Sequence, residues 1–380
     1  MNSETRYVSA PFVREIAFRG RPYFVREDQR RRLVAATAAT RHVLARMAAG
    51  ATAAETASGW VGGAAGEIER AVDALAGAAL LVPLDDVRLE PPSIELEITN
   101  RCNADCVMCP RKDLRALGTM DETTFSRVLA ILGAIPARGV IVQGIGEPTL
   151  DRDLVRRMER VRGVMPRQPL AVVTNGFRMT PALLSSLRSA GVDHVQWSFH
   201  SLRRGTYDAI MGTPAYDVAL GNLEACAAEH ADVLSLNVVV MDRNRADVDE
   251  LRAWARAHGL PDDAVRLIPC MSRGGRVDVD ALASGGSRAA RGRCVYVKKS
   301  IFIAWNGDLL PCSSDIAGEA VWQNVRELES SSLLAEWRDR ILAPPPAFPM
   351  CARCDHFLRD TLDSAWFDAI HGASIAEVGE

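Results

Sequence analysis

The sequence lacks three features that mark particular classes of protein: a long apolar run, a signal peptide and an excess of charge of one sign. No apolar run approaches the ~20 residues that are needed to span a bilayer. The N-terminus does not show the charged start and apolar core of a secretory signal. The formal net charge is −3, so nothing in the composition favours a nucleic-acid or membrane partner. We therefore expect a soluble cytoplasmic protein.

The composition is otherwise that of a globular protein whose cysteines are grouped. Hydrophobic residues make up 48% and charged residues 24% of the 380 positions, and this length is enough for two or three domains. Nine cysteines are present, and most of them fall into two groups. In a reducing compartment, grouped cysteines are more often metal ligands than disulfide partners.

The first group has three cysteines within eight positions. Cys102, Cys106 and Cys109 have the spacing C-x3-C-x2-C. Thiolates are the preferred ligands of iron–sulfur clusters, which normally take four of them, so a set of three leaves one iron open for another ligand. A zinc knuckle that borrows a fourth ligand is the alternative, although zinc sites usually contain two close pairs of cysteines. The spacing favours a cluster.

The stretch after residue 90 alternates between strand and helix patterns six times. The strands are predicted at 94–98, 140–142, 170–173, 195–199, 236–241 and 265–268. Helices are predicted between them, with Asp121 and Thr180-Pro181 as helix starts. Such units form a parallel sheet with helices outside, curled or fully closed, whose chemistry lies at the carboxyl ends of the strands. The three cysteines directly follow the first strand.

Further polar residues are predicted at the same rim. The run Gly144-Ile145-Gly146-Glu147-Pro148 follows the second strand, where glycines let backbone approach a ligand and a carboxylate can pair with an ammonium group. Taken alone, this run also fits a simple turn. Asn175 follows the third strand and Ser198 ends the fourth, where each either contacts a ligand or caps a turn. Asn244 is a weaker candidate, and His200 is expected to be satisfied by backbone rather than to transfer protons.

The cysteine triplet after strand one, together with Glu147-Pro148 after strand two, resembles the signature of radical S-adenosylmethionine (SAM) enzymes. The resemblance covers about residues 91–268. It implies that Cys102, Cys106 and Cys109 hold a 4Fe–4S cluster whose open iron binds SAM. The SAM contacts that it implies are Gly144, Gly146, Glu147, Pro148, Asn175 and Ser198.

The resemblance also implies a reaction. One electron, from a flavodoxin- or ferredoxin-type donor, cleaves SAM to a 5′-deoxyadenosyl radical that takes a hydrogen atom from the substrate, while the protein supplies placement and excludes water. Two positions depart from the family pattern. Met108 stands where an aromatic residue is usual, and Ile145 interrupts the usual Gly-Gly-Glu-Pro run.

The second cysteine group comprises Cys294, Cys312, Cys351 and Cys354. With the Asn306-Gly307 hairpin signal before Cys312, it resembles the Twitch/SPASM-like extensions of radical SAM enzymes that carry auxiliary clusters. Four ligands imply the short Twitch form, with one saturated 4Fe–4S cluster that relays electrons. A structural zinc site is the alternative.

The remaining two cysteines and one loop have less distinctive settings. Cys226 is expected in a helix core, and Cys270 is more often an inert packed thiol than a hydrogen donor or spare ligand. The run Ser272–Arg276 is expected to be a loop, with the binding of an anionic substrate group as the alternative.

Residues 1–90 predict a separate winged-helix-like module. Short β-prone pieces precede helices at 38–49 and 67–78, and Thr52-Ala53-Ala54-Glu55 fits a capping box that opens a further helix between them. The outline resembles the PqqD-like domains that hold a leader peptide by strand addition. A structural or dimerisation domain is the open alternative.

These observations predict an α/β fold with three parts: a winged-helix-like domain at 1–90, a partial (β/α)6 barrel at 91–270 and a small iron–sulfur domain at 271–380. The favoured function is radical SAM modification of a ribosomally made peptide, by cross-linking or oxidation. The first alternative is a radical dehydrogenase or epimerase of a small molecule such as a sugar or cyclitol. A remote alternative is a zinc-containing DNA-binding protein.

Overall fold

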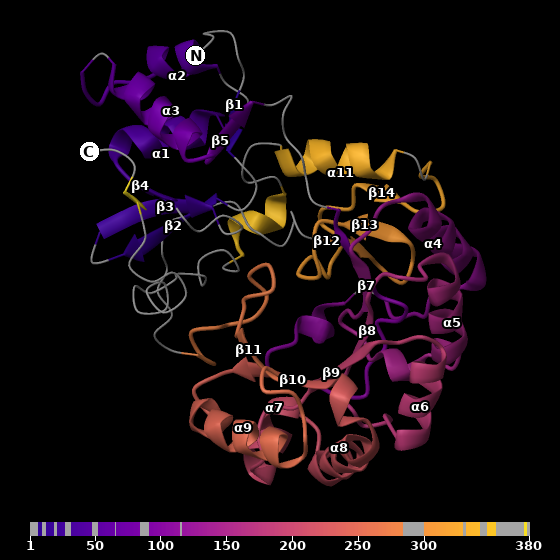
Figure 1. Ribbon diagram of the computed structural model, residues 1–380. Helices are drawn as coiled ribbons and strands as arrows, with labels where there is room; N and C mark the ends of the chain where they lie inside the picture. The colour runs from indigo at the N-terminus through magenta and orange to yellow at the C-terminus, as the bar shows by residue number, and fades with distance from the viewer. Residues whose placement is uncertain are drawn as a thin grey trace.

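A curled sheet of nine strands organises the molecule, and helices cover its outer face (Figure 1). The computed structural model describes residues 7–9, 13–18, 21–26, 32–47, 52–64, 66–83, 91–114, 116–283, 300–329, 332–342, 348–354 and 376–377. The strands of this sheet lie in the order β11-β10-β9-β8-β7-β6-β12-β13-β14. Cys294, one of the predicted ligands in the second cysteine group, lies outside the described residues.

Six of these strands are parallel and form the predicted partial barrel. They are β6 (Ser93–Leu96), β7 (Gly139–Val142), β8 (Leu170–Thr174), β9 (His194–Ser198), β10 (Leu234–Val240) and β11 (Val265–Pro269). Each pairs in register with its neighbour along the chain, as Ile94 does with Val140 and Val140 with Leu170. The barrel stays open, because β11 pairs only with β10 among the described strands.

The helices between these strands lie in an arc outside the sheet (Figure 1). They are α4 (Glu122–Ala134), α5 (Leu154–Val164), α6 (Pro181–Ser189), α7 (Arg204–Met211), α8 (Tyr216–His230) and α9 (Val248–Ala257), with short 3-10 helices η3 (Pro110–Asp113), η4 (Pro148–Leu150), η5 (Ala231–Val233) and η6 (Arg245–Asp247). The predicted starts are confirmed: the Asp121 side chain accepts from Thr124 N, and the Thr180 side chain from Leu183 N.

Alternation along the strands gives the sheet two different faces. In β6, Ile94 and Leu96 are fully buried in the core between sheet and helices. Glu95, one position away, faces the other side because successive strand residues point to opposite faces. The same alternation in β9 and β10 places Gln196 and Asn237 on the inner face, where their amide groups are hydrogen bonded at 3.1 Å. The inner face of the barrel therefore carries polar groups at several positions.

The C-terminal segment extends this sheet rather than starting a new one. Strand β12 (Ser300–Ile303) runs parallel to β6, and β13 (Asp308–Leu310) and β14 (Gln323–Asn324) follow by antiparallel pairing. The predicted hairpin is confirmed, but its loop has three residues, 305–307, because Ala304 N donates to Asp308 O. Gly307 takes a φ of +90°, as a three-residue hairpin requires. Helix α11 (Leu333–Leu342) and the 3-10 helix η7 (Pro349–Ala352) complete the segment.

The N-terminal module has its own sheet and core. Strands β2 (Val13–Phe18), β3 (Arg21–Arg26) and β4 (Arg32–Ala35) are antiparallel, and β1 (Tyr7–Ser9) pairs with β5 (Leu81–Pro83). Helices α1 (Ala38–Met47), α2 (Ala53–Ser58) and α3 (Glu67–Gly77) pack on them through Val43, Met47, Ile68, Val72 and Leu75. The predicted capping box at Thr52 and Glu55 is confirmed.

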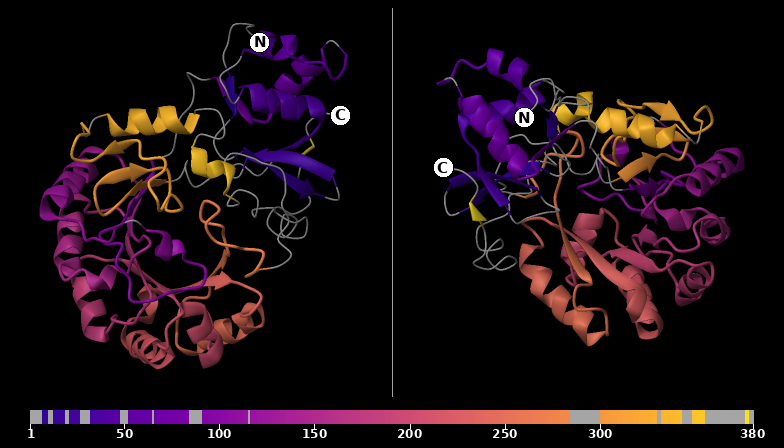
Figure 2. Two further views of the ribbon diagram at one scale, coloured as in Figure 1. Left: turned by 180° about the vertical axis from the view of Figure 1, so that it is seen from behind. Right: turned by 45° about the horizontal axis from the view of Figure 1, so that its top comes forward.

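One more strand joins this sheet from the far end of the chain. β15 (Ala376–Glu377) pairs in parallel with β4, at Arg32 and Leu33. Figure 2 shows the N-terminal module beside the C-terminal segment, away from helices α5, α6 and α8. No helix among the described residues is long and apolar enough to cross a membrane.

A buried ion pair connects helix α5 to the barrel rim. The Arg157 guanidinium lies 2.8 Å from the Asp151 carboxylate, donates to Met120 O at 2.5 Å and lies 4.5 Å from the Phe125 ring centroid. Both charged side chains are 4% exposed. Arg156, the next residue in the helix, is 53% exposed and pairs with Asp153 at the surface.

We predict that Arg157→Met lowers the free energy of unfolding by about 3–5 kcal/mol, because it leaves the Asp151 carboxylate buried without its partner. Denaturant unfolding of the full chain measures this loss. Arg156→Met is the matched control and is expected to cost about 1 kcal/mol or less. Equal losses of unfolding free energy in the two variants would show that the buried ion pair stabilises the fold no more than the surface pair does.

Candidate functional site

The first cysteine group lies on a loop that is closed at its base. Thr99 Oγ1 donates to Gly118 O at 2.8 Å, and Met120 N donates to Ile98 O at 2.7 Å. Within the loop, Asn100 spans the gap by donating to Ala116 O and accepting from Gly118 N. These bonds hold the ends of the loop together directly after β6, at the predicted rim.

The far side of the loop is held by the end of helix α7. Asp105 N donates to Met211 O at 3.0 Å, and Val107 N donates to Ile210 O at 2.9 Å. The next residue, Gly212, has a φ of +63°, and a Cβ there would lie only 2.0 Å from Asp105 O. Glycine is therefore required for the cysteine loop to dock against α7. Helix α7 has no counterpart among the helices expected from the sequence.

The three thiols of this loop lie close together and are half-buried. Burial raises the pKa of Cys102, Cys106 and Cys109, and neighbouring thiolates of the group further raise the pKa of Cys102 and Cys106. Positive charge on Arg111 opposes this rise in the pKa of Cys102 and Cys109. Three poorly hydrated thiolates need compensating positive charge, and the irons of a cluster would supply it. The donor set therefore fits an iron–sulfur cluster.

No group of three or more His, Cys, Asp or Glu side chains in the described parts of the chain is arranged to hold a single metal ion.

Glu147 is the most enclosed charged group at the rim. Its side chain is 2% exposed. One carboxylate oxygen accepts from Thr149 N, Thr149 Oγ1 and Thr174 Oγ1, and the other accepts from Asn175 N at 2.7 Å. Burial raises the pKa of Glu147, while these four donors oppose the rise. The carboxylate is thereby committed to joining the end of β7 to the end of β8.

The two glycines of the rim approach the protein's own chain. A Cβ on Gly144 would lie 2.4 Å from Glu97 Oε1, and a Cβ on Gly146 would lie 2.1 Å from Thr99 O. Glu147 N also donates to Arg101 O at 2.8 Å. The two glycines therefore let the segment after β7 pack directly against the segment after β6, at the base of the cysteine loop.

Asn175 links β8 to the cysteine loop, whereas Ser198 is more open. Asn175 Nδ2 donates to Asn103 Oδ1 at 2.8 Å and lies 3.9 Å from Cys102 Sγ, and its Oδ1 accepts from Phe177 N. Ser198 is half-buried at the end of β9, opposite Asn237. The structure thus brings Glu147, Asn175 and the triplet into one constellation.

His200 and Asn244 serve the backbone. His200 Nδ1 accepts from Val239 N at 3.2 Å, and burial lowers the pKa of this histidine to about 4. The expected backbone contact of His200 is confirmed. Asn244 is fully buried, accepts from Met241 N and donates to His200 O and Val239 O. The amide group of Asn244 is used in closing the turn after β10, so the structure does not favour Asn244 as a ligand contact.

The described members of the second cysteine group also come together. Cys312 and Cys351 belong to one apolar cluster with Met350. Burial and the neighbouring Cys354 raise the pKa of Cys351 to about 11. Cys354 and Cys312 are 9% and 6% exposed. These three thiols form a buried soft-donor set.

The other two cysteines behave as packed thiols. Cys226 is buried in α8, its thiol contacts Met179 O at 3.5 Å, and its pKa is raised to about 12 by burial. Cys270 is 1% exposed in an apolar cluster with Ile210 and Met241.

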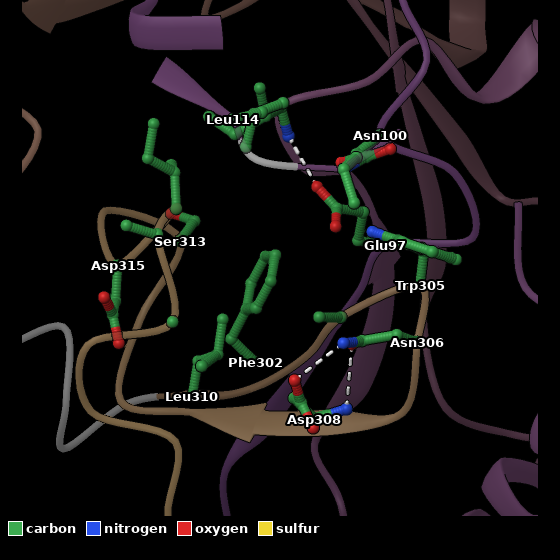
Figure 3. A pocket seen from close by; sticks show the side chains of 16 residues that line it. Glu97, Asn100, Leu114, Phe302, Trp305, Asn306, Asp308, Leu310, Ser313 and Asp315 are labelled. Atoms are coloured by element: carbon green, nitrogen blue, oxygen red, sulfur yellow. Dashed lines mark hydrogen bonds between the residues drawn. The ribbon is translucent and has the colours of Figure 1, made fainter. Parts of the chain in front are cut away.

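A cavity of about 160 Å³ adjoins the rim, between the base of the cysteine loop and the C-terminal hairpin (Figure 3). Its lining includes Glu97, Asn100, Trp305, Asp308 and Asp315. Glu97 Oε1 accepts from Ile145 N at 2.9 Å, and burial raises the pKa of Glu97 to about 7. Glu97 was not among the candidates from the sequence, although a carboxylate that alternates with apolar strand residues was the available signal.

Comparison with known proteins identifies the central domain. Residues 96–255 match the Radical SAM superfamily. A GTP 3′,8-cyclase of Heliobacterium modesticaldum is 31% identical over 169 residues, which are 43% of this chain and 50% of the relative. The chain spans about half the length of the curated relatives it matches.

Solved structures resemble the fold over nearly the whole chain. SuiB of Streptococcus suis bound to S-adenosylmethionine has a TM-score of 0.55 at 12% identity, covering 98% of this chain and 99% of that one. SuiB bound to its precursor peptide SuiA gives a TM-score of 0.54 with the same identity and coverage. At this identity the likeness concerns the fold alone.

The superfamily match confirms the predicted enzyme class over residues 96–255. With the class come its two cofactors, SAM and a 4Fe–4S cluster. The auxiliary cluster, the Twitch/SPASM-like and PqqD-like domains, the domain boundaries and the role of each site residue remain predictions.

We predict that Glu97→Gln changes how stability depends on pH. The folded-state pKa of Glu97, about 7, lies above the ordinary value of 4.5, so the neutral form of Glu97 favours folding. That contribution is full below pH 4.5 and is lost as the pH rises through 7. Glutamine stays neutral and keeps the acceptor for Ile145 N. Relative to the parent, the variant should therefore gain on the order of 3 kcal/mol between pH 4.5 and 7.

Denaturant unfolding at a series of pH values measures this gain. The pH-dependent contribution of His200 is the same in the parent and the variant, so it cancels in the difference. Glu159→Gln on the exposed face of α5 is the control. A pH-independent difference between Glu97→Gln and the parent would contradict the raised pKa.

Proposed function

We propose that this radical SAM enzyme modifies a ribosomally made peptide, by cross-linking or by oxidation at an unactivated carbon. The observation that carries the proposal is the presence, in one chain, of the rim constellation and of an N-terminal module whose sheet pairs with extended chain along β4. The rim offers three thiols beside Asn175 and Glu147. The module offers the edge of β4, which already pairs with an extended segment, β15.

The first cysteine group supplies the cluster site in this proposal. Cys102, Cys106 and Cys109 would hold a 4Fe–4S cluster as thiolates, and Arg111 would offset part of their charge. When bound and reduced, that cluster would supply the one electron that splits SAM into methionine and the 5′-deoxyadenosyl radical, which takes a hydrogen atom from the substrate. Asn175 orients the loop through Asn103.

The rim residues form the SAM site. Gly144, Gly146, Glu147, Pro148, Asn175 and Ser198 are proposed to line it. The Glu147 carboxylate acts mainly by fixing the rim, since protein donors already bind both of its oxygens. The backbone of β7 and the exposed part of Ser198 remain for contact with the cofactor.

The second cysteine group is proposed to hold an auxiliary 4Fe–4S cluster. Cys312, Cys351 and Cys354 lie together as buried soft donors, and Cys294 would be the fourth ligand. A saturated cluster would accept the electron that a net oxidation leaves over. A flavodoxin- or ferredoxin-type protein is the proposed electron donor, in the cytoplasm.

Peptide recognition is proposed to use strand addition at β4. Main-chain hydrogen bonds to an exposed sheet edge give affinity without requiring a particular sequence. The pairing of Ala376 and Glu377 with Arg32 and Leu33 supports this choice, because it shows that the edge accepts extended chain, and a bound peptide would take the place of β15. The fold likeness to SuiB, solved with its precursor peptide, extends over the same module.

A small-molecule substrate is the second candidate. The inner face of the barrel carries polar pairs such as Gln196 with Asn237 and His194 with Ser235. These groups suit a hydroxylated substrate, as in a radical dehydrogenase or epimerase of a sugar or cyclitol. The curated relatives, which the chain matches over about half of their length, are named GTP 3′,8-cyclase.

We predict that anaerobic reconstitution gives about eight irons per chain, and that replacing Cys102, Cys106 and Cys109 together by Ala leaves about four. Formation of 5′-deoxyadenosine should disappear in this variant, because the cluster that delivers the electron is lost. Iron analysis and chromatography of the nucleoside measure both effects. Cys226→Ala, a buried cysteine of α8, is the control and should keep full iron. Stoichiometric zinc without iron, or retained 5′-deoxyadenosine in the triple variant, would refute the assignment.

We predict that removing residues 1–90 abolishes binding of a precursor peptide encoded by a neighbouring gene, since the β4 edge is lost. Fluorescence anisotropy with the labelled peptide measures binding. Formation of 5′-deoxyadenosine without peptide should persist in the truncated chain, which shows that the barrel still folds. Unchanged peptide affinity would count against leader recognition by the module and favour the small-molecule candidate.

A further inference from the structure

The loop after β11 has a specified conformation, although its composition predicted only a connecting loop. Arg276 N and Val277 N both donate to Ser272 O, at 2.8 and 2.9 Å. Arg273, Gly274 and Gly275 take φ values of 48°, 71° and 82°. Three successive residues in the left-handed region are rare, and for the non-glycine Arg273 this conformation costs energy. Surrounding contacts must therefore hold the loop in place.

Those contacts come from the segments that carry the second cysteine group. A Cβ on Gly274 would lie 3.3 Å from Ser314 O and from Met350 Cε. A Cβ on Gly275 would lie 2.7 Å from the Cβ of Arg353. Figures 1 and 2 show the loop reaching the short C-terminal segment at η7. The paired glycines are needed because the two chains approach this closely.

Ion pairs extend the contact to the first cysteine group. Arg276 lies 2.7 Å from the Glu319 carboxylate and 3.8 Å from that of Asp113, and Arg353 lies 2.5 Å from Glu319. Asp113 ends η3, which begins directly after Cys109. Glu319 follows Cys312 in the chain, and Arg353 stands between Cys351 and Cys354. One arginine therefore connects the segments of both groups.

We infer that Arg276, held by the Ser272–Arg276 loop, is a positioning residue that fixes the C-terminal cysteine segments against the first cysteine loop. We name this set, the loop with Asp113, Glu319 and Arg353, the arginine brace. The inference rests on the proposed function in one respect, namely that the cysteines hold clusters. The protection and placement of the C-terminal thiols by Arg276 do not depend on bound clusters. For a relay of electrons, such a brace keeps the two clusters at one separation.

The first test uses the full, metal-free chain. Peptide mass spectrometry measures the rates at which Cys312 and Cys354 are alkylated, with Cys226 as the internal reference. Arg276→Ala should raise the alkylation rate of both thiols about fivefold, as expected for a partly exposed ion pair. Gly275→Ala should raise it about tenfold, since it combines a left-handed φ with a steric clash. Arg276→Lys, which keeps the charge opposite Glu319, should recover part of the protection.

Two matched controls isolate the brace from general effects. Arg245→Ala removes a surface arginine that is 61% exposed and pairs with Asp242 three positions away. Gly221→Ala adds a Cβ in α8 where no atom lies within 4 Å. Both should leave the alkylation rates of Cys312 and Cys354 within twofold of the parent. If Arg276→Ala or Gly275→Ala behaves like its control, the brace is refuted.

The second test uses the reconstituted protein. Electron paramagnetic resonance of the reduced protein reports the magnetic interaction between the two clusters. Arg276→Ala should weaken it, with Lys restoring part of the signal, while the iron of the first group stays unchanged. An unaltered interaction, or equal iron loss from both groups, would overturn the positioning role. If the parent holds no second cluster, the auxiliary-cluster proposal fails, and the alkylation rates alone decide whether the brace exists.

Discussion

The buried carboxylate of Glu147 is the interaction on which the site depends. A charge with 2% exposure is tolerated only because four donors from Thr149, Thr174 and Asn175 face its oxygens. Those donors come from the ends of two neighbouring strands, so the carboxylate fixes the rim at the point where the chains leave the sheet. Through Asn175 the same fixation reaches Asn103 and the first cysteine loop.

Much of the barrel could be predicted from the sequence, because its signals are local. Helix starts at Asp121, Thr180 and Thr52 depend on a side chain capping a backbone N–H a few positions away. The strand–helix cadence and the spacing of the triplet are equally local, and the superfamily match over 96–255 agrees with them. Features of this kind need no knowledge of the rest of the molecule.

Other features could not be predicted because they arise between distant segments. The Ser272–Arg276 loop is rich in glycine and arginine, and its order comes from Ser314, Met350 and Arg353. The raised pKa of Glu97 comes from burial beneath the C-terminal hairpin, and the hydrogen bond from Ile145 N opposes the rise. Likewise, the close approach of Gly144 to Glu97 and of Gly146 to Thr99 joins segments that are more than 40 positions apart, which no local pattern indicates.

The parallel pairing of β12 with β6 has a consequence for how the molecule assembles. Ser300 donates to Glu95 across 205 positions of sequence, so this strand pair is among the most non-local contacts of the barrel. Contacts between residues far apart in the sequence form late, because closing the long loop between them costs entropy. During synthesis the edge of β6, which adjoins the first cysteine loop, stays open until the C-terminal hairpin is made. The first cysteine loop is therefore synthesised beside an unpaired edge of β6, before the second cysteine group is complete.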